Sequence, residues 1–234
     1  MYSKLCDKII SSPNHSGKRK HNIDTITIHT MAFNGTIEDC GRLFSKKESK
    51  ASSNYGIGSD GRIAGYVDEG NRSWCSSSSS NDNRAITIEV ASLTSCYPWK
   101  CSDAAYQSLI KLLVDICKRN NITELKWKND KSLIGKPDLQ NMTVHRWFAN
   151  KVCPGDYLMS IMNKITEEVN YRMNRYHYVE DIPEGLYRDT VNKWIKDGVL
   201  SGRGKEDGKT IIDLTEDMIR CNIIAERMIS NGEH

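Results

Sequence analysis

The sequence predicts an α/β or α+β layered domain followed by a small α-helical module. Residues 25–29 and 85–91 alternate apolar and polar side chains with the period of a β-strand. Long helical patterns with one apolar face begin after Ser102 and near Gly155. Strands mixed with helices of this length are typical of a sheet covered by helices.

Composition limits the function classes. The 234 residues suffice for one medium domain plus a small one, and such a chain buries a core without disulfides. The hydrophobic fraction of 38% and charged fraction of 27% are those of an ordinary globular protein. The net charge of +3 is too small to indicate a nucleic-acid partner. No apolar run approaches the roughly 20 residues of a membrane span, so we expect no membrane partner either.

The amino-terminal residues and the cysteines are expected to carry little chemistry. The first residues lack the apolar core of a signal peptide, so we expect a cytoplasmic chain until it is released at lysis. Residues 1–22 are polar and basic and indicate a solvated arm, with attraction to an anionic surface as the alternative. The eight cysteines form no CxxC pair, which favours reduced thiols, of which one or two at most are functional.

The two strand patterns each place one polar residue of interest. In residues 25–29 the isoleucines share one face and His29 lies on the other, which predicts a half-buried strand. In residues 85–91 the apolar residues share one face and Glu89 lies on the other. A carboxylate in mid-strand among β-branched residues is unusual and makes Glu89 a candidate functional residue.

Local signals define the elements between and after these strands. Thr36 and Asp39 have the spacing of a capping box and predict a short helix. Asp60-Gly61 predicts the turn of a hairpin between residues 55–58 and 62–67. The serine run at 76–80 indicates a flexible surface loop. Ser102 is the expected N-cap of the next helix.

The pattern changes past residue 170. Residues 171–179 have the character of a linker, and helical patterns follow over 184–197 and 215–229. A charged, glycine-rich segment joins these two helices. A module of about sixty residues with two short helices is too small to bring its own catalytic apparatus.

Three residues form a candidate zinc site. His29 closes the first strand, His145 lies in the segment TVHRW, and Cys153 lies in KVCPG, where Pro154-Gly155 forces a turn. Two imidazoles and a thiolate suit Zn²⁺ and leave the fourth tetrahedral position for water. On residue types alone, two chance histidines and a core cysteine are the competing interpretation.

The motifs resemble a known family. The segment 143–156, TVHRWFANKVCPGD, resembles the carboxy-terminal signature of zinc-dependent N-acetylmuramoyl-L-alanine amidases, the type 2 amidases of the peptidoglycan recognition protein fold. Residues 26–29, 53–61 and 85–89 resemble further motifs of the family in the same order, over residues 20–170. The resemblance implies a mixed central β-sheet flanked by helices, here assigned to residues 1–172, and a phage endolysin or autolysin of clostridial type.

The resemblance assigns roles to individual residues. It implies that His29, His145 and Cys153 bind Zn²⁺, that Glu89 is the catalytic base, and that Lys151 stabilises the oxyanion. Alternatives remain for two of these residues, since Glu89 could pair with a nearby arginine such as Arg84, and Lys151 could be surface charge.

The hairpin departs from the family pattern. Ser53 stands where other members have a functional tyrosine, and Asn54 stands where many have histidine, while Tyr55 is expected to pack. Asn54 and Trp74 are the candidate substrate-binding residues. A packing or rim role for Trp74 is the alternative.

The implied function is peptidoglycan hydrolysis at the amide between the lactyl group of N-acetylmuramic acid and L-alanine. The implied partner is the peptidoglycan of a Gram-positive wall. The competing hypothesis is a recognition module that binds peptidoglycan without cutting it. Because non-catalytic members of this fold commonly replace the cysteine ligand, the presence of Cys153 favours the enzyme.

The second module, residues 178–234, has a looser resemblance to one S-layer-homology-type repeat of the kind that ends many clostridial-type amidases. This implies attachment to a wall polymer, which would raise the effective concentration at the substrate. A helical cap on the amidase or a dimerisation element is the alternative, and the sequence specifies no oligomeric state.

Overall fold

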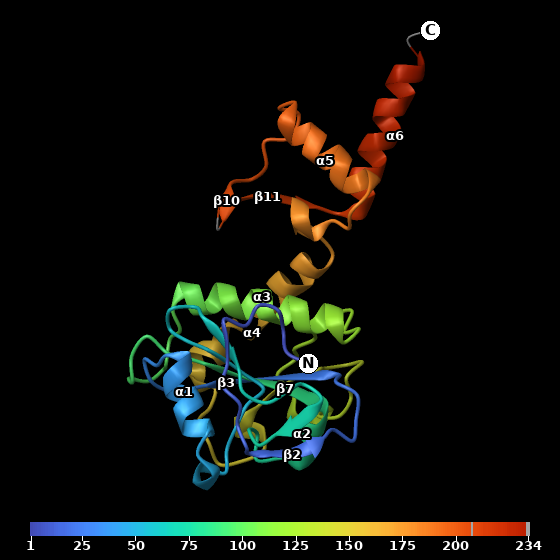
Figure 1. The fold of residues 1–234 in the computed structure, drawn as a ribbon. Helices are drawn as coiled ribbons and strands as arrows, with labels where there is room; N and C mark the ends of the chain where they lie inside the picture. Colours follow the sequence, from blue (N-terminus) through green and yellow to red (C-terminus); the bar gives the residue numbers. More distant parts are fainter. Residues whose placement is uncertain (207, 233–234) are drawn as a thin grey trace. The chain divides into compact units, whose positions relative to one another are not determined.

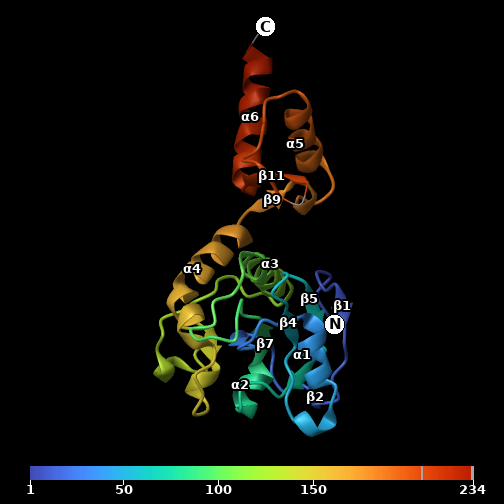
Figure 2. The ribbon, with the colours of Figure 1, turned by 90° about the vertical axis from the view of Figure 1, so that its left-hand side faces the viewer.

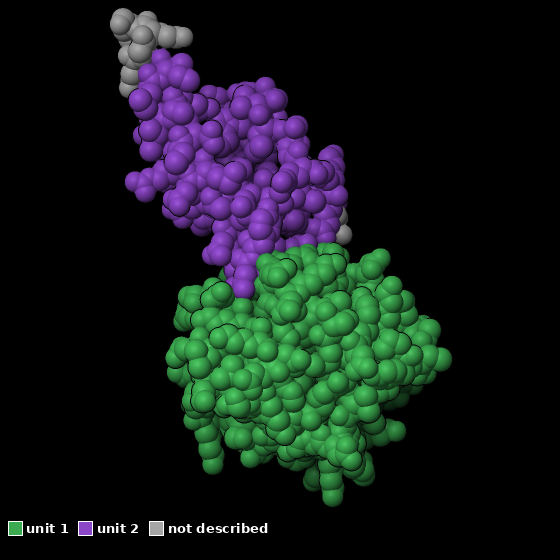
Figure 3. All heavy atoms as spheres, turned by 180° about the vertical axis from the view of Figure 1, so that it is seen from behind, with its two compact units in different colours: residues 1–169 green, residues 170–234 purple. Residues whose placement is uncertain are grey.

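The computed structural model describes residues 1–206 and 208–232 and divides the chain into two compact units, residues 1–169 and 170–234 (Figures 1 and 3). The boundary falls within helix α4 (Gly155–Met173). Among the described residues, no helix combines the length and the apolar character that crossing a membrane would require.

The first unit is built on a mixed six-stranded sheet with the order β1-β5-β4-β7-β3-β8. All neighbouring strands are parallel except β4 and β5, which form the predicted hairpin. A separate antiparallel ribbon pairs β2 with β6. The strands are β1 (Lys8–Ile9), β2 (His15–Lys18), β3 (Thr25–Thr30), β4 (Tyr55–Ile57), β5 (Ile63–Gly65), β6 (Asn71–Ser73), β7 (Ala85–Val90) and β8 (Met142–Val144).

Helices cover the sheet, which confirms the predicted α/β class. Helix α3 lies along one face, and α2 and the β2 ribbon lie on the opposite side (Figures 1 and 2). The predicted capping box of Thr36 and Asp39 and the predicted N-cap Ser102 are both present. The helical elements are α1 (Ile37–Phe44), η1 (Lys47–Ser49), α2 (Ser79–Arg84), α3 (Asp103–Arg119), η2 (Lys131–Leu133), η3 (His145–Trp147) and α4.

The core joins the apolar face of β3 and β7 to the apolar stripe of α3. Its fully buried side chains include Ile26, Ile28, Ile86, Ile88, Leu109, Leu112, Leu113 and Ile116. The expectation that residues 25–29 are half-buried is wrong, because all six residues of β3 are buried. The polar side chains of β3 have hydrogen-bond partners that make their burial possible. The Thr27 hydroxyl lies 2.8 Å from the Thr143 hydroxyl, and Asn81 Nδ2 donates to the Thr27 hydroxyl at 2.9 Å.

The expectation of a solvated amino-terminal arm is also wrong. This segment supplies strands β1 and β2, and Arg19 is only 9% exposed. The Arg19 guanidinium donates to the carbonyl oxygens of Glu69 and Asp82 and to Asn54 Oδ1. Hydrogen bonds to fixed acceptors make burial of the Arg19 side chain possible, although most of the segment's other residues are exposed, and composition does not reveal these bonds.

The second unit contains the two predicted helices, α5 (Leu186–Lys196) and α6 (Glu216–Gly232). It also contains an antiparallel sheet with the order β10 (Lys205–Glu206), β11 (Lys209–Leu214) and β9 (Tyr176–Tyr178). The short helix η4 (Val179–Asp181) follows β9 along the chain. The sheet lies in segments that the sequence indicated as linker and loop. A separate core comprises Ile182, Val191, Trp194, Ile212, Ile219 and Ile223.

Asn81 offers a test of the polar network beneath the sheet. Its side chain donates to Thr27 and Ser76 and accepts from Thr143, so Asn81→Ala leaves buried hydroxyls short of partners. We expect the free energy of unfolding to fall by about 2 kcal/mol. Urea unfolding followed by tryptophan fluorescence measures it. Asn83→Ala on the same helix is the matched control and should change stability by about 0.5 kcal/mol or less. Equal effects of both variants would contradict a stabilising network.

Candidate metal centre

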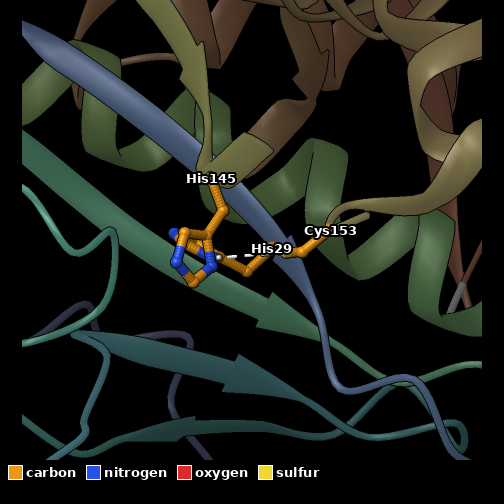
Figure 4. Close-up of side chains that lie close together, drawn as sticks. All are labelled: His29, His145 and Cys153. Atoms are coloured by element: carbon orange, nitrogen blue, oxygen red, sulfur yellow. Dashed lines mark hydrogen bonds between the residues drawn. The ribbon is translucent and has the colours of Figure 1, made fainter. Parts of the chain in front are cut away.

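The three predicted metal ligands lie together at one edge of the sheet (Figure 4). His29 is near the carboxyl end of β3, His145 begins η3 directly after β8, and Cys153 lies in the loop before α4. One ligand atom from each lies within 4.8 Å of the others. Cys153 Sγ is 3.5 Å from His29 Nδ1, and the two imidazole centroids are 5.0 Å apart.

The loop that carries Cys153 is tied to the segment that carries His145. The Arg146 N–H donates to the Cys153 carbonyl at 3.1 Å, and the Gly155 N–H donates to the Val152 carbonyl at 2.9 Å. The Trp147 ring stacks on Trp127 with a centroid distance of 5.2 Å. Backbone bonds and ring stacking therefore fix both ligand-bearing segments.

Two consecutive serines hold the two histidine rings. His29 Nε2 lies 3.3 Å from Ser76 Oγ, and His145 Nε2 lies 3.0 Å from Ser77 Oγ. These bonds engage Nε2 of each ring and leave Nδ1 for a metal. Proteins commonly fix the tautomer and orientation of a ligating histidine through a hydrogen bond at the nitrogen that does not bind the metal. The arrangement around Ser76 and Ser77 has this form.

The serine run is thus not the flexible surface loop that the sequence indicated. Ser76 is completely buried, and Ser78 caps α2 by accepting from the Asn81 N–H. The Asp82 carboxylate accepts from the backbone N–H groups of Cys75 and Ser76. The sequence did offer a signal for this helix, since Ser78 is a favourable N-cap residue. Interpreting the serine run as a flexible loop hid that signal.

The electrostatic setting suits a divalent cation. Burial, together with the neighbouring His145, lowers the pKa of His29 to about 3. Burial also lowers the pKa of His145, with Asp82 opposing and Lys151 adding to the effect. Both imidazoles are therefore neutral near pH 7. Burial and then Glu89 raise the pKa of the Cys153 thiol, so a thiolate there needs a cation as its counter-charge. Two neutral imidazoles and one sulfur fit Zn²⁺.

Glu89 lies beside this set without an ionic partner among the described residues. It is paired in register with His29 on the neighbouring strand. Its Oε1 accepts the Cys75 S–H at 3.8 Å, whereas Oε2 is buried and has no hydrogen-bond partner within the described chain. Burial raises the pKa of Glu89 to about 8. The alternative pairing with Arg84 is wrong, because the Arg84 guanidinium binds Asp24.

A cleft of about 230 Å³ opens beside the candidate metal centre. His145, Glu89 and Trp74 are among the residues that line it, and most of the remaining lining is apolar and includes Met31, Phe33, Leu43 and Phe44. The Trp74 indole N–H donates to Ser16 Oγ at 2.6 Å, which fixes the ring at the cleft wall. Contact of Trp74 with a substrate stays a prediction.

Two other predicted site residues, Lys151 and Asn54, differ in their exposure to solvent. Lys151 is exposed in the loop before Cys153, and its charge acts on both His145 and Cys153. Asn54 is completely buried; its side chain accepts from Arg19 and Thr87 and donates to the Val67 carbonyl. A substrate cannot reach Asn54 in this position, which makes it part of the scaffold.

The fold matches solved structures at low sequence identity. The structure of PlyL superposes with a TM-score of 0.50 at 12% identity, covering 70% of this chain and 96% of that one. An AmpD derivative superposes with a TM-score of 0.52 at 18% identity, with the same coverage of each chain. These similarities concern the fold alone. No curated protein matches the sequence.

The family model described as N-acetylmuramoyl-L-alanine amidase matches residues 19–156, which is more than half of the chain. The matched range contains His29, Glu89, His145 and Cys153. The chain therefore belongs to the type 2 N-acetylmuramoyl-L-alanine amidase family.

Proposed function

We propose that this protein is a peptidoglycan hydrolase, an endolysin or autolysin, which cleaves the amide between the lactyl group of N-acetylmuramic acid and L-alanine. The observation that carries the proposal is the convergence of His29, His145 and Cys153, with each histidine held at Nε2 by a serine. Family membership supports the substrate class. When bound by these residues, Zn²⁺ supplies a Lewis acid that activates water and polarises the amide carbonyl.

Glu89 is the proposed general base and acid. Its carboxyl lies beside His29 on the adjacent strand and within the cleft that a substrate would enter. In the metal-free chain burial raises the pKa of Glu89 to about 8, and the positive charge of a bound cation would lower it towards neutral pH, where a carboxyl can both accept and release a proton. In the proposed reaction Glu89 takes a proton from the attacking water and delivers it to the departing amine of L-alanine.

Lys151 is the proposed stabiliser of the negative charge that grows on the amide oxygen. Its charge acts on both His145 and Cys153, which lie at the metal centre. The side chain is exposed and belongs to the same loop as Cys153. A lysine in this position brings a positive charge to the reacting carbonyl at little desolvation cost.

The second unit is the proposed wall anchor. Its six-residue buried core gives it a fold of its own, and no catalytic role is assigned to it. Binding to a wall polymer would keep the amidase unit close to its substrate. This proposal also fits the looser sequence resemblance of residues 178–234.

The bond that is cleaved can be identified from the products. We expect purified Gram-positive walls treated with the zinc-loaded protein to release new amino termini without new reducing ends. Prior removal of zinc with a chelator should abolish that release, and added Zn²⁺ should restore it, because the proposed reaction needs the Lewis acid. New reducing ends alone would identify a glycosidase and refute the proposed reaction.

Glu89→Gln tests the base while retaining the shape of the side chain. We expect the rate of amino-terminus release to fall at least about 100-fold, because the amide cannot accept the proton. Zinc content, measured by elemental analysis, should remain one ion per chain at one equivalent of added zinc. Glu124→Gln, at a side chain that is 57% exposed, is the matched control and should keep the full rate. A fully active Glu89→Gln protein would remove the base assignment.

The anchor is tested by comparing the full chain with one that ends after Met173. We expect sedimentation with purified walls to show affinity lower by about tenfold or more in the short chain, because the second contact is lost. Thermal unfolding of the short chain checks that the amidase unit remains folded. Equal wall affinity and equal hydrolysis rate in both chains would rule out an anchoring role.

A further inference from the structure

The thiol of Cys75 lies in the cleft beside the proposed base, and the proposed reaction does not use it. Cys75 follows strand β6, and its backbone N–H donates to Asp82 Oδ2 at 3.1 Å. This bond fixes the position from which the thiol reaches Glu89 Oε1, 3.8 Å away. Cys75 also lines the cleft together with Glu89 and His145. A sulfur is thus held beside both the proposed base and the metal centre.

Cys75 belongs to a second set of potential metal ligands. One ligand atom each from His29, Cys75 and Glu89 lies within 4.8 Å of the other two. The parallel register that pairs His29 with Glu89 brings the imidazole and the carboxyl to the same edge of the sheet. Glu89 Oε2 is buried and has no hydrogen-bond partner in the described part of the chain. A buried carboxyl oxygen of this kind gains from a cation.

We propose that His29, Cys75 and Glu89 form a second binding position for a thiophilic divalent cation such as Zn²⁺ or Cd²⁺. Nitrogen, sulfur and carboxylate oxygen are the three donor types that zinc accepts in proteins. The thiolate and the carboxylate carry two negative charges, which balance the two positive charges of the ion. The set of His29, His145 and Cys153 carries only one negative charge, that of the Cys153 thiolate. His29 is common to both sets.

Occupation of the second position has a consequence for the reaction. His29 Nε2 is engaged by Ser76, so its remaining nitrogen binds one ion at a time. In a chain that already holds an ion at His29, His145 and Cys153, a second ion is held by Cys75 and Glu89 and occupies the carboxyl that the proposed mechanism needs as base. Zinc in excess of one equivalent therefore inhibits hydrolysis. This consequence rests on the proposed function, whereas binding of the ion does not.

Cobalt binding tests the second ligand set without any assay of hydrolysis. Co²⁺ is titrated into the metal-free full chain, and the thiolate-to-cobalt charge-transfer absorption is recorded. In Cys153→Ser the thiolate of the first set is lost, yet we expect the absorption to persist because Cys75 supplies it. In the double variant Cys75→Ser/Cys153→Ser we expect it to disappear. Cys153→Ala gives the same comparison without an oxygen donor at that position.

Two results of the cobalt titration would overturn the proposal. One is that Cys153→Ser and Cys153→Ala both lack charge-transfer absorption, although circular dichroism shows that both variants are folded. The other is undiminished absorption in the double variant, which would assign the thiolate to another cysteine, such as Cys40 in the same cleft.

Inhibition by zinc tests the consequence. Each protein is compared with its own rate at one equivalent of Zn²⁺, and the zinc concentration that halves this rate is measured. We expect Cys75→Ser to need a concentration higher by about tenfold or more, since a ligand is lost. Cys40→Ser is the matched control and should retain the wild-type value. Equal inhibition of the wild type and Cys75→Ser would contradict the consequence, and failure of the hydrolysis assay itself would instead count against the proposed function.

Discussion

The site depends on the parallel register of three neighbouring strands. Ile28 of β3 is paired with Ile88 of β7 and with Val144 of β8. The next residue along each strand is therefore His29, Glu89 or His145, and the three emerge side by side at the carboxyl edge of the sheet. A shift of one residue in either pairing would turn the side chain to the opposite face, against α3. The isoleucines and Val144 are fully buried and fix this register through packing.

Side chains of helix α2 fix the segments around the site residues through hydrogen bonds. Asn81 links Thr27 of β3 and Thr143 of β8 to Ser76, and Ser76 contacts His29. Asp82 holds the backbone of Cys75 and Ser76. Each neutral hydrogen bond contributes only about 1 kcal/mol, yet an unpaired buried polar group costs more than that. The network therefore acts mainly by excluding other arrangements of the loop, and this keeps the two histidine rings oriented.

The sequence predicted what local patterns encode. Alternation identified β3 and β7, side-chain caps identified α1 and α3, and the resemblance led to the three ligands that the fold brings together. What it missed depends on long-range polar contacts. Arg19 is buried because three oxygen acceptors from distant residues surround it, and Ser76 is buried because Asp82 and Asn81 bind it. Composition assigns both residue types to the surface, since it contains no information about such partners.

The ionisation of the site residues explains how the fold forms around a candidate metal centre. With neutral histidines, a raised pKa at Cys153 and a pKa of about 8 at Glu89, the chain without a metal buries no uncompensated charge there at neutral pH. The aliphatic core between the sheet and α3 supplies the packing that small zinc domains lack. Binding a cation then requires loss of the Cys153 proton, and the cost of that deprotonation is offset by coordination at a site whose ligands are already in place. Preorganisation by register and by α2 would therefore let this buried, neutral set of side chains bind the proposed cation without refolding.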